Sequence, residues 1–232
     1  MKKIFTVPLI TAACSVIANS TPFDGLYLGA SAGYTQRNQT FSMNVTGIEN
    51  GTPFNANAQK SKRINAFNYG LMTGYGYVTS GVYLGGEISL HHDTASEDEN
   101  YSVLISSNSG NGSLPVKVRY NRSPVLGFAP RLGIVFAESY MAFIKPGVEI
   151  SRDRIEIDAE SRDTTSRKTK FTFVPGIGIT KAVHNNLLVT ISYDYGFGNK
   201  ISVHSNPGDN ATGNYSVKYT SHSFKAGVAY RF

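Results

Sequence analysis

The sequence predicts an all-β fold, an eight-stranded antiparallel up-and-down transmembrane β-barrel. Three observations lead to this prediction. Eight strand-like runs follow one another along the chain, short and long connections alternate between them, and apolar side chains alternate with small or polar ones within the runs. The composition agrees, because 23 Gly, 14 Tyr and 13 Phe with only 16% charged residues favour short strands over helices.

Each run has the period of two that is typical of a strand. In the run that begins at Leu187 the odd-numbered residues are apolar or aromatic, whereas Thr190, Ser192 and Asp194 occupy the other face. A strand of about ten residues is long enough to cross a bilayer at a tilt. The predicted strands are Leu26–Thr35, Phe67–Val78, Val82–His91, Pro124–Phe136, Tyr140–Ser151, Phe171–Thr180, Leu187–Phe197 and Tyr219–Phe232.

The connections between these runs alternate strictly in length. Three are short, with the sequences "TSG", "AES" and "KAVHNN". A soluble sandwich has no reason to follow this rule, because both of its ends meet the same water, whereas a barrel in an asymmetric membrane has short turns on one side and long loops on the other. The predicted long outer loops are residues 36–66, 92–123, 152–170 and 198–218.

The N-terminal segment "MKKIFTVPLITAACSVIANS" is typical of a secretory signal peptide. It has two lysines, then an apolar stretch, then small residues. We expect cleavage after Ala18 or Ser20, so that residues 1–18 are the signal and residues 19–232 the barrel. Cys14, the only cysteine, lies inside the removed segment.

The start "FDGLYLGASAGY" and the end "GVAYRF" resemble the OmpA-like outer-membrane β-barrel family, in particular its small surface-antigen members of the barrel-only type. The resemblance covers the whole mature chain as a pattern. It implies localisation in the bacterial outer membrane, a closed or barely conducting lumen, and a C-terminal aromatic signal, here Tyr230 and Phe232, that the barrel assembly machinery reads. The last strand is expected to close the barrel against the first.

Proline and aromatic residues add two expectations. Pro130, Pro146 and Pro175 fall inside predicted strands, where each removes a hydrogen-bond donor, so bulges or local distortion are expected. Outward aromatic residues should form two belts at the membrane interfaces. The periplasmic belt comprises Tyr77, Phe136, Tyr140, Tyr230 and Phe232, and the outer belt comprises Tyr34, Phe67, Tyr195 and Phe197.

The strand faces opposite the apolar sets must fill the interior, and they carry a balanced set of charges. The inward residues are Glu87, Arg131, Lys145, Glu149, Asp194 and Lys225. If Phe136 pairs with Tyr140, Arg131 lies opposite Lys145, and the two bases need Glu87 and Glu149 as bridges. Asp194 and Lys225 are expected to form a second pair. The alternative is that some of these residues lie near the rims of the barrel, in water.

The sequence predicts no catalytic, cofactor or metal site. His91 and His92 are interpreted as solvated loop residues, because adjacent residues of a strand point to opposite faces. His222 and Ser223 are adjacent as well, which argues against an enzymatic pair, so the protein is expected not to be an enzyme. The charge of +6 is spread along the chain without a basic block, so nucleic acid is not expected as a partner.

The sequence predicts a non-enzymatic surface protein, a structural barrel whose exposed loops serve adhesion or the binding of a host or other ligand. The alternative is a narrow channel for ions or small solutes. Six inward charges argue against a channel, since a pore needs a continuous lumen of small polar residues. The expected partners are outer-membrane lipid and lipopolysaccharide, the barrel assembly machinery, and a host-surface ligand of the loops.

Overall fold

The computed structural model describes residues 21–49, 52–94, 96–107, 110–122, 124–159, 162–184, 186–198, 200–208 and 211–232. The predicted signal peptide, residues 1–18, lies outside them. Among the described residues no helix is long and apolar enough to span a membrane. The strands are β1 (Gly25–Glu49), β2 (Thr52–Thr79), β3 (Val82–Asp93), β4 (Ser96–Ser107), β5 (Gly110–Arg122), β6 (Val125–Phe136), β7 (Tyr140–Ala159), β8 (Arg162–His184), β9 (Leu187–Gly196), β10 (Lys200–Gly208) and β11 (Ala211–Arg231).

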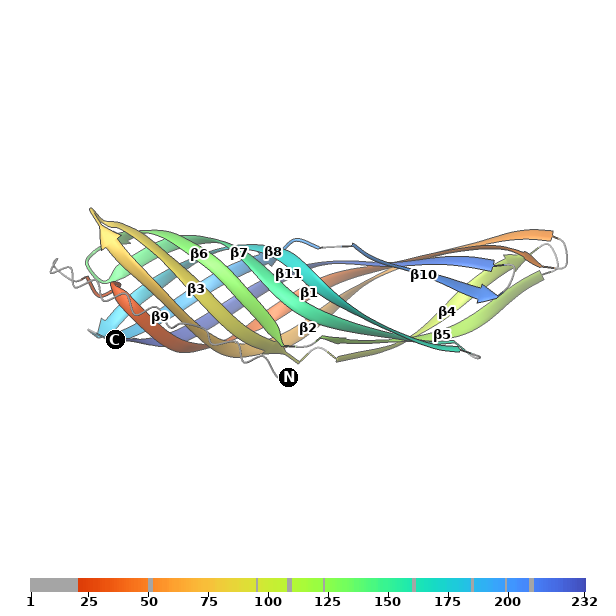
Figure 1. Ribbon diagram of the computed structural model, residues 1–232, viewed down its shortest axis with the longest axis horizontal. Coiled ribbons are helices and arrows are strands. Elements are labelled where there is room, and N and C mark those ends of the chain that lie inside the picture. The colour runs from red at the N-terminus through yellow and green to blue at the C-terminus, as the bar shows by residue number, and fades with distance from the viewer. Residues whose placement is uncertain are drawn as a thin grey trace, which may run out of the picture.

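Eight of these strands form a closed antiparallel ring, as the sequence predicted (Figure 1). Its order is β1, β2, β3, β6, β7, β8, β9 and β11, and β11 pairs with β1 to close it. The closing ladder runs from Tyr27 opposite Arg231 to Gly47 opposite Ala211. Closure leaves no strand edge in the ring, so its backbone donors and acceptors find partners within the wall.

The strands are tilted, and their register gives the tilt. A row of paired residues that starts at Phe67 on β2 returns to β2 at Tyr77, ten residues nearer the short turns; in between it passes Tyr34, Phe224, Tyr193, Ile177, Ile144, Leu132 and Leu84. An offset of ten residues over eight strands corresponds to a tilt of about 40°. All nine residues of the row are apolar or aromatic, and none is buried inside the ring.

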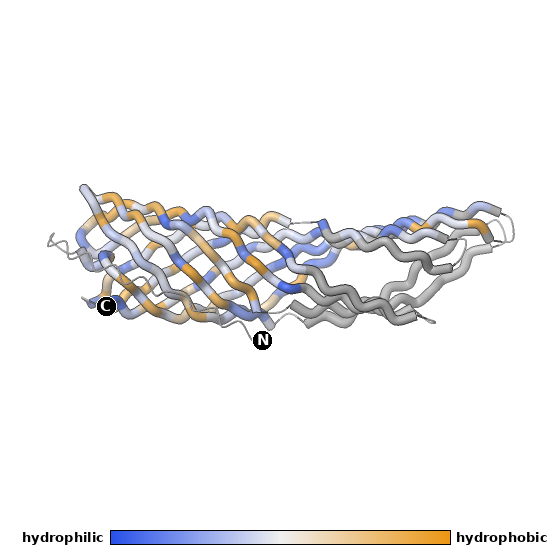
Figure 2. The backbone as a smooth tube through the Cα atoms, in the orientation of Figure 1, coloured by the Kyte–Doolittle hydropathy of each residue, from blue (hydrophilic) through white to orange (hydrophobic). Residues whose placement is uncertain are grey.

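The outer face of the ring is apolar. Leu71 is 61% exposed and Ile191 67% exposed, and many other large hydrophobic side chains point outward with them. Figure 2 shows hydrophobic residues throughout the ring and hydrophilic residues where it ends. From the level of Tyr77 to that of Phe67 the strand rises about 25 Å along the barrel axis, which matches the apolar band of an outer-membrane barrel.

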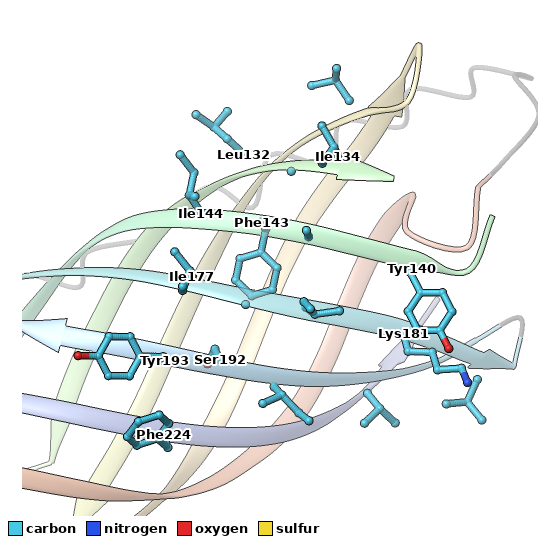
Figure 3. Close-up of a pocket in the computed structure, with 18 residues that line it drawn as sticks. Leu132, Ile134, Tyr140, Phe143, Ile144, Ile177, Lys181, Ser192, Tyr193 and Phe224 are labelled. Atoms are coloured by element: carbon cyan, nitrogen blue, oxygen red, sulfur yellow. The ribbon is translucent and has the colours of Figure 1, made fainter. Parts of the chain in front are cut away.

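Figure 3 shows part of this outer face in close-up. Leu132, Ile134, Ile144 and Ile177 project from the wall around a broad, open apolar hollow over β6 to β9. The ring of Phe143 enters the lining from the inner face, because Gly178 on the neighbouring strand has no side chain to block it. The hollow is thus part of the apolar outer face of the wall.

Aromatic residues mark both ends of the apolar band. At the end with the short turns, Tyr77, Phe136 and Tyr140 lie within three residues of a turn, and Tyr230 and Phe232 lie at the end of β11. Phe136 stacks on Tyr140 with ring centroids 5.8 Å apart. At the other end Tyr34 pairs with Phe67, and Phe197 stacks on Phe173. These are the positions that the sequence predicted for the two belts.

The tight turns occupy one end of the ring. Ser80 and Gly81, which join β2 to β3, both have positive φ values, 50° and 79°. This is the backbone of a two-residue type I′ hairpin, whose twist matches that of the strands that it joins. Ala137 and Glu138, between β6 and β7, also have positive φ values. The chain therefore reverses here with few residues.

The segments expected as long loops are mostly paired strands. β1 and β2 stay in register as far as Glu49 opposite Thr52, and β7 and β8 as far as Ala159 opposite Arg162. Beyond the ring, β4 and β5 pair with each other and β5 with β7, while β10 pairs with β11. Beyond the apolar band the outward face of these strands becomes polar, while backbone pairing continues and side chains such as Phe41 and Val45 stay buried on the inner face. For this reason the predicted strands end too early.

This outer part, here called the extension, consists of two walls of four strands each. The first contains β10, β11, β1 and β2, and the second contains β4, β5, β7 and β8. Figure 1 shows both walls continuing beyond the ring on the side away from the C-terminus. The extension places regular backbone, rather than irregular loops, at the exposed end of the molecule.

The three prolines interrupt the wall without a register shift. Pro130 lies opposite Gly86, and Pro146 lies opposite Pro175. Between β6 and β7 the paired residues stop at Leu132 opposite Ile144 and resume at Phe128 opposite Val148 in the same register. The expectation of bulges or local distortion is therefore met by distortion, since the β6–β7 ladder is interrupted without a register shift. The ladder skips its missing donors, which leaves the inward and outward faces unchanged.

Candidate functional site

The lumen at the short-turn end is filled by apolar and aromatic side chains. Phe23, Tyr27, Met72, Tyr83, Met141, Phe143, Leu188 and Ala229 form one buried cluster. Tyr83 is 2% exposed, and Gly76 and Gly85 lie against its ring, where any Cβ would overlap it. A cavity of about 10 Å³ remains between Phe23, Tyr27, Arg131 and their neighbours, which is room for roughly one water molecule.

Glu87 and Arg131 form an ion pair above this cluster. The Nη2 of Arg131 lies 2.5 Å from Oε2 of Glu87, and both side chains are about 95% buried. The hydroxyl of Tyr27 donates to the same carboxylate oxygen at 3.2 Å. The guanidinium of Arg131 also lies 4.4 Å from the centroid of the Phe143 ring. Charge pairing and a cation–π contact thus hold Arg131 across the lumen.

Asp194 bridges two lysines. Its Oδ1 lies 2.9 Å from Nζ of Lys145, and its Oδ2 lies 3.1 Å from Nζ of Lys225. From the sequence we predicted that Asp194 pairs with Lys225, and that Glu87 and Glu149 bridge Lys145 and Arg131. The structure contains the first contact, whereas Lys145 pairs with Asp194 instead. Asp194 is 2% exposed, and one buried carboxylate therefore compensates two ammonium groups.

Glycines on intervening strands permit these contacts. Lys145, Gly176 and Asp194 lie in one row across β7, β8 and β9, and a Cβ on Gly176 would fall 2.2 Å from Asp194 Oδ1. In the same way Gly74 lies between Tyr27 and Glu87 on the strands to either side of it. An inward glycine removes the side chain that would separate its two neighbours.

Glu149 and His91 occupy the lumen nearer the extension. His91 Nε2 lies 3.3 Å from Oε1 of Glu149. The interpretation of His91 as a solvated loop residue is wrong, because this side chain is 8% exposed and points inward from β3. His92 points the other way and contacts the ring of Tyr69.

Sequence reasoning missed a further group of buried charges. Arg37 pairs with Asp93, and the Lys170 ammonium lies 3.0 Å from the centroid of the Tyr219 ring. Arg37, Asp93 and Lys170 fell in segments predicted as loops. Two of them could have been found from the sequence. Arg37 is two residues after the inward Thr35, and Asp93 is two residues after the inward His91, so both point inward as long as the strands stay paired.

The C-terminal residues close the wall at the short-turn end. The backbone N–H of Phe232 donates to the carbonyl of Leu26 at 2.9 Å, and Arg231 donates to the carbonyl of Asn186 at 2.8 Å. The rings of Tyr230 and Phe232 meet edge to face, with centroids 5.2 Å apart, and both are more than half exposed. The backbone of Phe232 thus belongs to the wall while its ring faces outward.

The adjacent residues His222 and Ser223 lie on opposite faces of the wall. Ser223 points into the lumen toward Thr35 at 2.8 Å, whereas His222 is on the outside against Tyr193 at 2.7 Å. Within the described ranges, no group of three or more His, Cys, Asp or Glu side chains is placed to hold a metal ion. The arrangement is instead a stack of charge pairs and aromatic rings that fills the barrel.

We expect Glu87→Ala to destabilise the barrel, because it leaves Arg131 uncompensated inside the lumen. Breaking a buried pair costs roughly 3–5 kcal/mol. Glu97→Ala, on β4 outside the ring, should change stability much less. Urea unfolding in detergent measures both variants. Equal unfolding midpoints would show that the contact of Glu87 with Arg131 does not contribute to stability.

The chain was compared with protein families and with solved structures. The family model described as "Outer membrane protein beta-barrel domain" matches residues 5–232. No curated protein matches the sequence significantly. Many solved structures match as well, and three of them follow. At identities of 11% and 13% the likeness to the first two concerns the fold alone.

The first is the outer membrane protease OmpT from Escherichia coli, at 11% identity, with 93% of this chain and 99% of that chain covered and a TM-score of 0.52. The second is the outer membrane protein OprG from Pseudomonas aeruginosa, at 13% identity, with 90% and 96% covered and a TM-score of 0.50. The third is neisserial surface protein A, at 13% identity, with 86% and 97% covered and a TM-score of 0.40.

Proposed function

Since the chain belongs to the family of outer membrane protein β-barrel domains, we propose that it is a non-enzymatic surface protein whose extension binds a ligand outside the cell. The barrel is the anchor in the bacterial outer membrane. The extension is the binding part, and its partner is a macromolecule on a host or neighbouring cell surface.

The length of the paired strands beyond the apolar band carries this proposal. β2 begins at Thr52, fifteen residues before Phe67 in the aromatic belt. At about 3.3 Å per residue this is roughly 50 Å of strand that needs no membrane. The turns at the opposite end are only a few residues long. An elongated, regular and water-exposed structure on one side favours recognition at that side.

The filling of the lumen argues against the channel alternative. Tyr27, Tyr83, Met141 and Phe143 meet across the short-turn end, and the Glu87–Arg131 pair lies directly above them. Conduction would require these contacts to open. We therefore expect planar bilayers that contain the wild-type protein to show little or no conductance.

Deleting one hairpin of the extension tests the proposal. Residues 38–63 are replaced by a short turn, so that β1 and β2 are joined just beyond the Arg37–Ile64 pair. Bacteria that express this variant should lose most of their binding to a panel of host-surface ligands. The ring and its aromatic belts should remain intact. Heat-modifiable migration on a gel measures whether the variant is folded.

The matched variant shortens the second wall instead. Residues 153–168 are replaced in the same way, beyond the pair of Arg152 and Thr169. Loss of binding in one variant and not in the other assigns the ligand to one wall. If cells carrying either folded variant bind as well as wild type to every ligand, the extension is not a binding part.

A further inference from the structure

One wall of the extension is almost free of acidic residues. The extended parts of its four strands are residues 36–49, 52–66, 200–208 and 211–223, and their only acid is Glu49, at the far tip of β1. They contain six lysines and arginines, namely Arg37, Lys60, Lys62, Arg63, Lys200 and Lys218. The other wall mixes both signs along its strands, as in "SRDRIEIDA" of β7. The two walls therefore differ in charge.

Three of these bases point away from the barrel axis. Arg63, Lys200 and Lys218 are exposed and lie on the outward parity of their strands. Within the part of the chain that the structure describes, none of the three has a carboxylate partner. Lys200 lies directly opposite Lys218 in the β10–β11 ladder. Two like charges in this position repel each other, and an anion between them would remove the repulsion.

The three bases lie at one level above the apolar band. Lys200 follows Phe197 by three residues, and Arg63 precedes Phe67 by four. On strands tilted by about 40° this puts them about 8–10 Å beyond the aromatic belt, where the head groups of the outer leaflet lie. Thr40 of β1 lies between Ser61 and Lys218, and the hydroxyls of Thr40 and Ser61 are 3.1 Å apart.

We propose that this surface, Arg63, Lys200 and Lys218 with the hydroxyls of Thr40 and Ser61, binds the phosphate groups of a phosphorylated glycolipid in the outer leaflet. A phosphate offers acceptor oxygens to ammonium, guanidinium and hydroxyl donors alike. The site lies at the depth of the lipid head groups, which favours a lipid phosphate over a soluble anion. This inference is independent of the ligand of the extension, because it concerns the base of the wall and not its length.

The experiment measures the binding of fluorescent diphosphorylated lipid A to the protein in phosphatidylcholine nanodiscs. One basic side chain near an anionic surface contributes about fivefold to binding, so Arg63→Gln/Lys200→Gln/Lys218→Gln should lose on the order of 100-fold. The charge-conserving variant Arg63→Lys/Lys200→Arg/Lys218→Arg should keep most of the affinity. Dephosphorylated lipid A should bind wild type and the glutamine variant equally.

Lys181→Gln is the matched control, since Lys181 is an exposed base at the short-turn end of the same barrel. It should leave lipid A binding unchanged. The proposal is overturned if the triple glutamine variant binds lipid A as wild type does, or if Lys181→Gln weakens binding equally. Competition with inorganic phosphate distinguishes a lipid phosphate from a soluble phosphate as the ligand. Complete displacement at matched phosphate concentration would assign the site to a soluble anion and overturn the lipid assignment.

Discussion

Asp194→Asn should destabilise the barrel more than any other single change in the lumen. The substitution keeps the shape of the side chain but removes the charge that lies between Lys145 and Lys225. Two buried ammonium groups then face each other without compensation. Because breaking one buried pair costs roughly 3–5 kcal/mol, we expect a loss at the upper end of that range. Urea unfolding in detergent micelles measures it.

A second substitution tests whether charge is the cause. Asp194→Asn/Lys145→Met removes one of the two uncompensated lysines and should recover part of the lost stability, a coupling that a double-mutant cycle quantifies. Glu138→Gln is the control, since Glu138 is an exposed acid in a short turn. If Asp194→Asn and Glu138→Gln unfold at the same urea concentration, Asp194 does not hold the two lysines.

Replacing Phe232 by Ser should strongly reduce the amount of assembled protein in cells. The ring is 66% exposed, packs on Tyr230 and lies in the aromatic belt of the short-turn end. The variant loses an interface anchor and, on our prediction, the signal that the assembly machinery reads. Heat-modifiable migration of the protein from whole membranes measures the assembled fraction.

Two comparisons separate the anchor from the signal. Phe136→Ser removes another exposed aromatic residue of the same belt, stacked on Tyr140. Refolding of purified Phe232→Ser into detergent needs no machinery, and the backbone bond from Phe232 to Leu26 remains available to it. We expect this variant to refold in vitro but to assemble poorly in cells. Equal assembly of Phe232→Ser and wild type in cells would contradict the prediction.

The six inward charges illustrate how much of the lumen could be predicted. Glu87, Arg131, Lys145, Glu149, Asp194 and Lys225 all lie on the inner face of the ring. Side-chain parity is a local property of a strand, so a period of two in the sequence is sufficient to assign it. Arg37, Asp93 and Lys170 were missed for a related reason. They lie at the edge of the apolar outer face, where apolar and polar residues no longer alternate, although the inner face persists.

What the sequence by itself determined is the number of ring strands, their antiparallel order, the face of each residue and the positions of the belts. These follow from local periodicity and from the lengths of the connections. Which acid meets which base was decided only by the tertiary structure. That choice depends on the offset of ten residues around the closed ring, and on glycines such as Gly176 that let Lys145 reach Asp194 across a strand. Both are properties of the whole ring, because register accumulates from strand to strand until the last one closes on the first.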